Sequence, residues 1–169
     1  MKAIMISIKP QYVEKILNGE KTIEIRKTML KCELPCKVYI YCTKGKKLYK
    51  CVSNFDEDLL NGKVVAEFTL NKVDILERDL NDWLPKNRYE VSNELLKNIN
   101  LNQNELWNYG QGKILYAWHI DDLKIYNKPK ELSDFTRIID YSSGFWHYCH
   151  REKVTRPPQS WMFVDNLEE

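Results

Sequence analysis

The sequence predicts a small α+β protein in which five or six strands and one early helix form a mixed β-barrel, with peripheral helices and inserted loops. Its apolar runs are short and often alternate with polar residues, as strands do, and only one early segment repeats apolar residues at helical spacing. The length of 169 residues and the hydrophobic fraction of 43% suit one domain, over residues 1–169, with its own core. Closing the barrel would remove its strand edges, and an open α+β sheet is the alternative.

The first segments have clear boundaries. Residues 3–8 form an apolar run that predicts a central strand. Pro10 can begin a helix, because the first helical turn does not use the N–H that proline lacks. The helix has one apolar face, made of Tyr12, Val13, Ile16 and Leu17. Gly19 is expected to end it with a positive φ, and residues 22–26 then follow as a strand whose two isoleucines face inward.

Four further strands are expected along the chain. Residues 37–43 and 63–73 alternate apolar and other residues, which is typical of strands. Residues 114–125 predict a longer strand with a bend at residues 121–122. Residues 160–164 follow two prolines and predict the closing strand.

The segments between these strands are predicted insertions, at residues 44–61, 77–112 and 136–151. The second of them is expected to hold two helices, at residues 92–99 and 102–107, each of which begins with a side chain that can cap it. Residues 129–135 predict a helical turn. Residues 136–156 have no clear periodicity and predict an inserted loop.

Charge is unevenly divided along the chain. The net charge is +2, but residues 1–51 hold 12 Lys and Arg against 4 Asp and Glu, a balance of +8. The remaining residues hold 14 against 20, a balance of −6. This division favours a basic surface that meets a polyanionic partner. The alternative is a dipolar surface without such a partner.

The five cysteines indicate neither disulfides nor a metal site. Their number is odd and their spacing irregular, which argues against a disulfide framework. The residues that could be combined into a metal site are Cys32, Cys36, His147, Cys149 and His150. Their spacing matches no standard zinc motif, so buried free thiols are favoured, and neither a metal nor a cofactor is predicted.

Hydropathy predicts a cytoplasmic protein. No apolar run approaches the ~20 residues of a membrane span, so no membrane partner is expected. The first ten residues hold an apolar core that is too short for a signal peptide.

The stretch from Gly19 to Arg26 holds the main candidate site. Lys21 and Arg26 can bind an anion, Arg26 through two hydrogen bonds and Lys21 as a point charge. In an extended strand Glu24 leaves the same face as Arg26, so its carboxylate can orient the guanidinium or act as a general base. The alternative is a surface strand with one weak ion pair.

The spacing Gly19-x-Lys21-x-x-Glu24-x-Arg26, after a helix that follows an N-terminal strand, resembles the signature of the ASCH domain family. That family is similar to PUA domains, which are RNA-binding pseudo-barrels. Other parts of the chain also resemble ASCH proteins of bacteria and their phages, namely residues 8–10, 37–43, 62–68, 116–120 and 156–161. The resemblance covers residues 1–164. It implies a pseudo-barrel that binds RNA or a nucleotide in a basic cleft beside the motif.

The resemblance also implies a hydrolase as an alternative. Some similar proteins are amidohydrolases that deacetylate N4-acetylcytidine with a threonine, a lysine and a glutamate, and others are proposed ribonucleases. Their lysine falls on Lys21, and their threonine falls on Glu24, which cannot do the same covalent chemistry. Their glutamate falls near Ile99, with Glu94 and Glu105 as neighbouring carboxylates. An enzyme of this kind would use Lys21 and Glu24. A third possibility is a phage-type protein-interaction module with a vestigial cleft and an unknown partner.

The full set of ligand-binding candidates is Lys9, Lys21, Glu24, Arg26, Tyr41, Thr43, Lys44, Ser160 and Trp161. Tyr41 ends a strand expected beside the motif, where it would either stack on a base or belong to the core. Lys44 begins a basic loop that suits nucleic acid backbone. Trp118 and His119 point to opposite faces of their strand. Trp118 is expected in the core, and His119 is either a proton carrier or a core residue.

Overall fold

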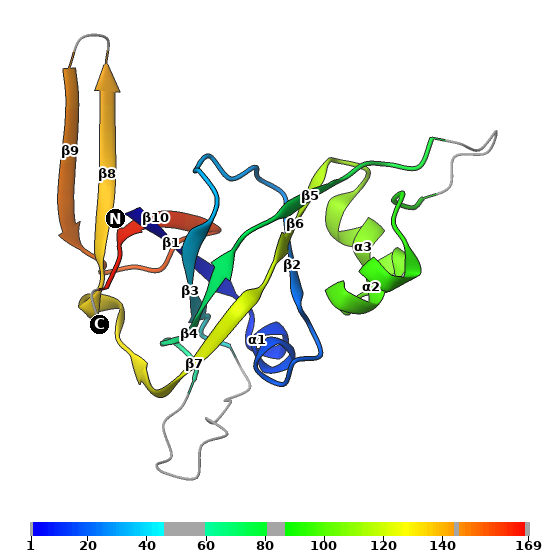
Figure 1. Cartoon of the computed structure of the whole chain (residues 1–169), viewed down its shortest axis with the longest axis horizontal. Coiled ribbons are helices and arrows are strands. Elements are labelled where there is room, and N and C mark those ends of the chain that lie inside the picture. Colours follow the sequence, from blue (N-terminus) through cyan, green and yellow to red (C-terminus); the bar gives the residue numbers. More distant parts are fainter. Residues whose placement is uncertain (1, 46–59, 81–86, 144–145, 168–169) are drawn as a thin grey trace. The chain divides into compact units, whose positions relative to one another are not determined.

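The structure, a computed structural model, describes residues 2–45, 60–80, 87–143 and 146–167. Its strands are β1 (Lys2–Ile8), β2 (Ile23–Arg26), β3 (Cys36–Cys42), β4 (Val64–Leu70), β5 (Val73–Leu76), β6 (Leu115–His119), β7 (Asp121–Lys130), β8 (Thr136–Ser143), β9 (Trp146–Lys153) and β10 (Trp161–Asp165) (Figure 1). Its helices are α1 (Pro10–Leu17), α2 (Asn93–Ile99) and α3 (Gln103–Gly110), with a 3₁₀ turn at Leu132–Asp134.

These strands form two sheets. One has the order β7-β4-β3-β1-β10-β8-β9, and the other has the order β2-β6-β5. Contacts within the chain divide it into two compact units. The first comprises Met1–Glu14, Cys36–Thr69 and Asp122–Glu169, and the second comprises Lys15–Pro35 and Leu70–Asp121.

β1 lies in the middle of the larger sheet, in the first unit. It pairs in parallel with β3 and antiparallel with β10, and its residues are almost all buried, as expected for a central strand. The core of this unit is a cluster of Ala3, Met5, Tyr39, Tyr41, Val64, Phe135, Val154 and Val164. The Tyr39 hydroxyl donates to Asn166 Oδ1 at 2.7 Å and accepts from the Leu167 amide at 2.9 Å, so this buried polar group is satisfied.

The second unit is a three-stranded antiparallel sheet with α2 and α3 packed on one face. Ile23 and Ile25 of β2 lie in its core, as predicted, together with Leu76, Tyr89, Ile99, Leu106, Leu115 and Ala117. Ser92 caps α2, and Asn102 forms the expected capping box with Glu105 at the start of α3. These caps satisfy amides that have no partner within the helix.

The ends of several predicted elements can be compared with the structure, in which two predicted strands are interrupted. Gly19 has the expected positive φ of 75° and ends α1 as predicted. The predicted strand 114–125 divides at Ile120 into β6 and β7, and Asp122, the second residue of β7, has a positive φ of 49° at the predicted bend. The predicted strand 63–73 also ends early, at Leu70, and β5 enters the other sheet.

The prediction of an inserted loop over residues 136–156 is wrong. β8 and β9 form a regular antiparallel hairpin, with register pairs from Thr136 opposite Lys153 to Ser143 opposite Trp146. β9 is an edge strand whose described side chains from Tyr148 to Arg151 are exposed. Such a strand needs no apolar alternation, which is why periodicity did not reveal it.

The α+β class and the mixed sheet are confirmed, whereas a closed barrel is not. Within the described residues, the order of the larger sheet starts at β7 and finishes at β9, with no pairing between these two strands. The larger sheet is therefore open across the described residues. None of the described helices is long and apolar enough to cross a membrane.

Candidate functional site

All four residues of β2 are buried, although two of them are charged. Across the sheet, Glu24 pairs with Trp118 and Arg26 pairs with Tyr116. Such directly opposed residues share a face of the sheet, and Trp118 is fully buried, as expected. The face that carries Glu24 and Arg26 is therefore covered, and the alternative of a surface strand with one weak ion pair is wrong.

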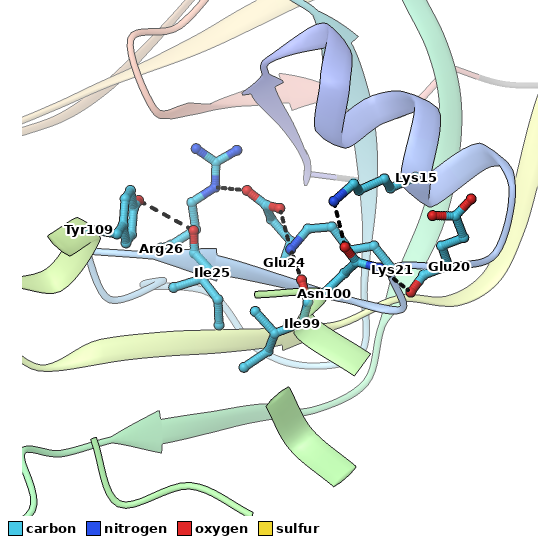
Figure 2. A network of polar contacts seen from close by, with 9 residues as sticks. All are labelled: Lys15, Glu20, Lys21, Glu24, Ile25, Arg26, Ile99, Asn100 and Tyr109. Carbon is cyan, nitrogen blue, oxygen red and sulfur yellow. Dashed lines mark hydrogen bonds and ion pairs between the residues drawn. The ribbon is translucent and has the colours of Figure 1, made fainter. Parts of the chain in front are cut away.

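Lys21, Glu24 and Arg26 form one buried charged cluster, here called the motif cluster (Figure 2). Glu24 Oε2 lies 3.4 Å from Lys21 Nζ, and Glu24 Oε1 lies 3.5 Å from Arg26 Nε. The exposed fractions are 3% for Lys21, 8% for Glu24 and 7% for Arg26. One carboxylate thus lies between two cations, and the cluster keeps one net positive charge.

Lys21 is also held by the carboxyl end of α2. Its Nζ donates to the Ile99 carbonyl at 2.8 Å. The last carbonyls of a helix have no partner within the helix and carry partial negative charge, which favours an ammonium group. The glutamate of the similar amidohydrolases falls near Ile99 in the sequence, and the group that Lys21 meets there is a main-chain oxygen. Glu94 and Glu105 are both exposed, and Glu105 is engaged in the capping box of α3.

Burial lowers the pKa of Lys21 below its ordinary value of 10.5. Glu24 opposes this shift through its charge and its hydrogen bond, while the charges of Arg26 and Lys15 add to it. Desolvation disfavours the charged form of an amine, so Lys21 releases its proton more readily than a solvated lysine does. A buried lysine of this kind is common at binding and catalytic sites.

Four candidates of the first unit gather at one end of the larger sheet. Thr43 donates its amide to the Ile8 carbonyl at 2.9 Å, which places Thr43 and Lys44 beside Lys9. The Ser7 amide donates to the Ser160 carbonyl at 3.1 Å. Lys9 and Lys44 are exposed, and Thr43 and Ser160 are half-buried. The group Lys9, Thr43, Lys44 and Ser160 is here called the edge set. The rest of the basic loop, residues 46–50, lies outside the described residues.

Two aromatic candidates pack within the first unit. Tyr41 belongs to the core cluster and is 2% exposed, so its ring lies in the core and not on a stacking surface. Trp161 is half-buried and meets Phe163 edge to face, with ring centroids 5.3 Å apart. Its Cα pairs with that of Ile6 in β1.

Sequence reasoning did not identify two polar features of the second unit. His119 Nε2 lies 2.7 Å from Asp74 Oδ2, and Lys72 Nζ lies 2.8 Å from Asp74 Oδ1, all three side chains being partly exposed. An open depression of about 530 Å³ lies beside the end of α2, lined by Lys15, Leu96, Lys97, Asn100, Leu101, Asn102, Gln103 and Glu105. In the sequence, lining residues such as Asn102 and Glu105 predicted only the cap of a helix and gave no indication of a depression. Within the described part of the chain, no group of three or more His, Cys, Asp or Glu could hold a metal ion.

The structure defines a small α+β protein with a buried Lys–Glu–Arg cluster on a short strand. No family model and no curated protein matches the sequence. Solved structures do match it. The chain is similar to ASCH from Zymomonas mobilis, with a TM-score of 0.59 and 16% identity over 96% of this chain and 87% of that chain. A serine-to-alanine variant of the same protein matches with a TM-score of 0.58 and 16% identity, over 96% of this chain and 88% of that chain. A tyrosine-to-phenylalanine variant matches with a TM-score of 0.52 and 18% identity, over 78% of this chain and 77% of that chain.

The chain therefore has an ASCH-domain fold. The predicted resemblance is confirmed at the level of the fold. Identity of this size carries no residue roles from one protein to the other.

Proposed function

We propose that this chain binds RNA or a nucleotide and holds phosphate and base beside the motif cluster. The observation that carries this proposal is the burial of three charged side chains next to one another, Lys21, Glu24 and Arg26. Removing an ion from water costs several kcal/mol, and the attraction between the ions offsets this only in part. Charged clusters that fold stability does not require are frequent at binding and catalytic sites.

The charges of the cluster suit a phosphate. Two cations and one carboxylate leave one positive charge, which one ligand anion would neutralise. Arg26 can bind two phosphate oxygens through its planar guanidinium, and Lys21 adds a point charge. Glu24 would orient both cations. Lys9 and Lys44, the exposed lysines of the edge set, belong to the first unit and are proposed separately as contacts to RNA backbone.

The test is binding of fluorescently labelled single-stranded RNA at low ionic strength, followed by anisotropy. Arg26→Lys keeps the charge but removes the fork, and Lys21→Met removes the net charge of the cluster. Each is expected to weaken binding about tenfold, equivalent to ~1.4 kcal/mol. Lys113→Met is the matched control, because Lys113 is an exposed lysine of the same unit.

Two results would overturn the proposal. One is the absence of RNA or nucleotide binding by the wild type at low ionic strength. The other is binding that Arg26→Lys and Lys21→Met leave unchanged while circular dichroism shows both variants folded. A protein partner captured equally by wild type and motif variants would favour an interaction module.

A second candidate function is hydrolysis of a modified nucleoside, of the N4-acylated cytidine type, or of RNA. The lowered pKa of buried Lys21 beside Glu24 favours it, because an amine that loses its proton readily can act as a base. Incubation with N4-acylated cytidines and with labelled RNA separates the two functions. Turnover that disappears in a folded Glu24→Gln variant, while RNA binding persists, would indicate an enzyme. Binding without turnover would indicate a binding domain.

A further inference from the structure

Three consecutive residues at the carboxyl end of α2 form hydrogen bonds with the segment that carries Lys21. Figure 2 shows the bonds of the last two, Ile99 and Asn100. The Asn98 carbonyl accepts from the Thr22 amide at 3.0 Å, and the Ile99 carbonyl accepts from Lys21 Nζ at 2.8 Å. The side-chain amide of Asn100 forms two hydrogen bonds, one through its oxygen and one through its nitrogen. We propose that Asn100 is a positioning residue, which holds the Lys21 ammonium against the Ile99 carbonyl and Glu24.

The side chain of Asn100 has one orientation that satisfies both of its partners. Oδ1 accepts from Lys15 Nζ at 2.5 Å, and Nδ2 donates to the Glu20 carbonyl at 3.4 Å. A flipped amide would face an ammonium with NH₂ and a carbonyl with oxygen, and both contacts would be lost. Asn100 thus joins Lys15, near the end of α1, to Glu20, the residue before Lys21.

The backbone of Asn100 explains why this residue type stands here. Its φ of 58° and ψ of 44° are left-handed, and its amide bonds to the Leu96 and Lys97 carbonyls as it ends α2. Glycine is the common residue at such a position, and asparagine is the usual alternative. Glycine would end the helix equally well but could not bridge Lys15 and Glu20. The asparagine therefore adds the link to the Lys21 segment.

This link bears on how Lys21 can act. The charged groups that act on its ammonium are Glu24, Arg26 and Lys15. Asn100 engages Lys15 through a hydrogen bond and adds a bond to Glu20. The amides of Glu20 and Lys21 also donate to the Lys15 carbonyl, at 2.9 and 3.1 Å, so Asn100 completes a set of bonds that the backbone begins. Lys21 can meet a ligand in a defined direction only if this segment is fixed. The functional importance of Asn100 rests on the proposed role of Lys21 in ligand binding, but the positioning itself does not.

The test uses Asn100→Gly, which keeps a residue suited to positive φ and removes only the side-chain bridge. Labelling of each lysine by an amine reagent, read by mass spectrometry, measures how often Lys21 opens to solvent. The labelling rate of Lys21 is expected to rise roughly tenfold, which corresponds to ~1.4 kcal/mol. The pKa of Lys21, followed by NMR of its side chain, is expected to rise toward its ordinary value as the ammonium becomes hydrated.

Two further variants keep the test specific. Gln111→Gly is the matched control. Gln111 ends α3 with a left-handed φ of 52°, as Asn100 ends α2, and its cap amide donates to the Trp107 carbonyl and not to the Lys21 segment. It is expected to leave Lys21 labelling unchanged. Asn100→Asp keeps an acceptor for Lys15 and is expected to restore slow labelling in part.

The outcome for Asn100 is separate from the outcome for RNA. Equal labelling and equal titration of Lys21 in wild type and Asn100→Gly would overturn the positioning role. Faster labelling with a raised pKa would support it, whether or not RNA binds. Failure of the wild type to bind RNA or a nucleotide would overturn the proposed function and leave these measurements valid.

Discussion

The motif cluster and the edge set both contain lysines that are candidates for ligand binding, but the structure gives them opposite surroundings. Lys21 is buried between a carboxylate and a helix end, whereas Lys9 and Lys44 are exposed at the end of a sheet. A buried charge is fixed in direction, weakly screened and altered in its acid–base behaviour. An exposed charge attracts anions from a distance, and salt weakens it. A charge pattern in the sequence therefore locates cations, while burial in the folded chain decides their chemistry.

The largest effect should come from removing the shared carboxylate. Glu24→Gln leaves Lys21 and Arg26 buried without their common counter-ion, and breaking a buried ion pair costs about 3–5 kcal/mol of the free energy of unfolding. Urea denaturation followed by circular dichroism measures this loss. Lys9→Ala is the exposed counterpart and should change stability by no more than about 0.5 kcal/mol. Similar small losses in both variants would contradict the difference between the two regions.

The second effect is the contribution that Lys21 makes to the dependence of stability on alkaline pH. Because burial lowers the pKa of Lys21, the unfolded chain binds more protons than the folded chain between the lowered value and 10.5. The contribution of Lys21 to the free energy of unfolding therefore rises with pH through this interval. Lys21→Met lacks this contribution, so its stability should fall relative to wild type as the pH approaches 10.5. A difference that stays constant with pH would show that Lys21 is hydrated in the folded state.

The smallest effect concerns the edge set and salt. If Lys9 and Lys44 each neutralise one phosphate of a single strand, the double variant Lys9→Ala/Lys44→Ala should reduce the slope of log affinity against log salt by about 1.4. RNA titrations at several salt concentrations measure this slope. Lys113→Ala, an exposed lysine of the second unit, should leave it unchanged. An unaltered slope in the double variant would remove the edge set from the binding surface.

Local chemistry made several elements predictable. Pro10 and Gly19 mark the start and stop of α1, and Ser92 and Asn102 cap α2 and α3, because each acts within one turn of its own position. The hairpin β8–β9 was missed because its exposed strand lacks a periodic apolar face. Ile138 and Ile139 are consecutive, which also breaks the alternation expected of a half-buried strand.

The charged residues of the site were predicted, but their burial was not. Alternation along residues 22–26 placed Ile23 and Ile25 inward, which is correct, and it placed Glu24 and Arg26 together on the opposite face without indicating that this face is buried. The pairing of β2 with β6 sets Glu24 opposite a buried tryptophan, and such a long-range pairing cannot be inferred from a local pattern. The contact of Lys21 with the Ile99 carbonyl could not be predicted either, because a sequence pattern distinguishes side chains and every residue has the same main-chain oxygen.

The bond from Lys21 to the Ile99 carbonyl has a consequence for mutational scanning. Every amino acid carries that oxygen, so no replacement at position 99 deletes it. Alanine there would register as lost apolar volume, since the isoleucine side chain is fully buried. A scan would classify the position as ordinary core packing and miss its polar contact. Only an edit that redirects the chain, such as one residue added to α2, would separate the oxygen from its lysine.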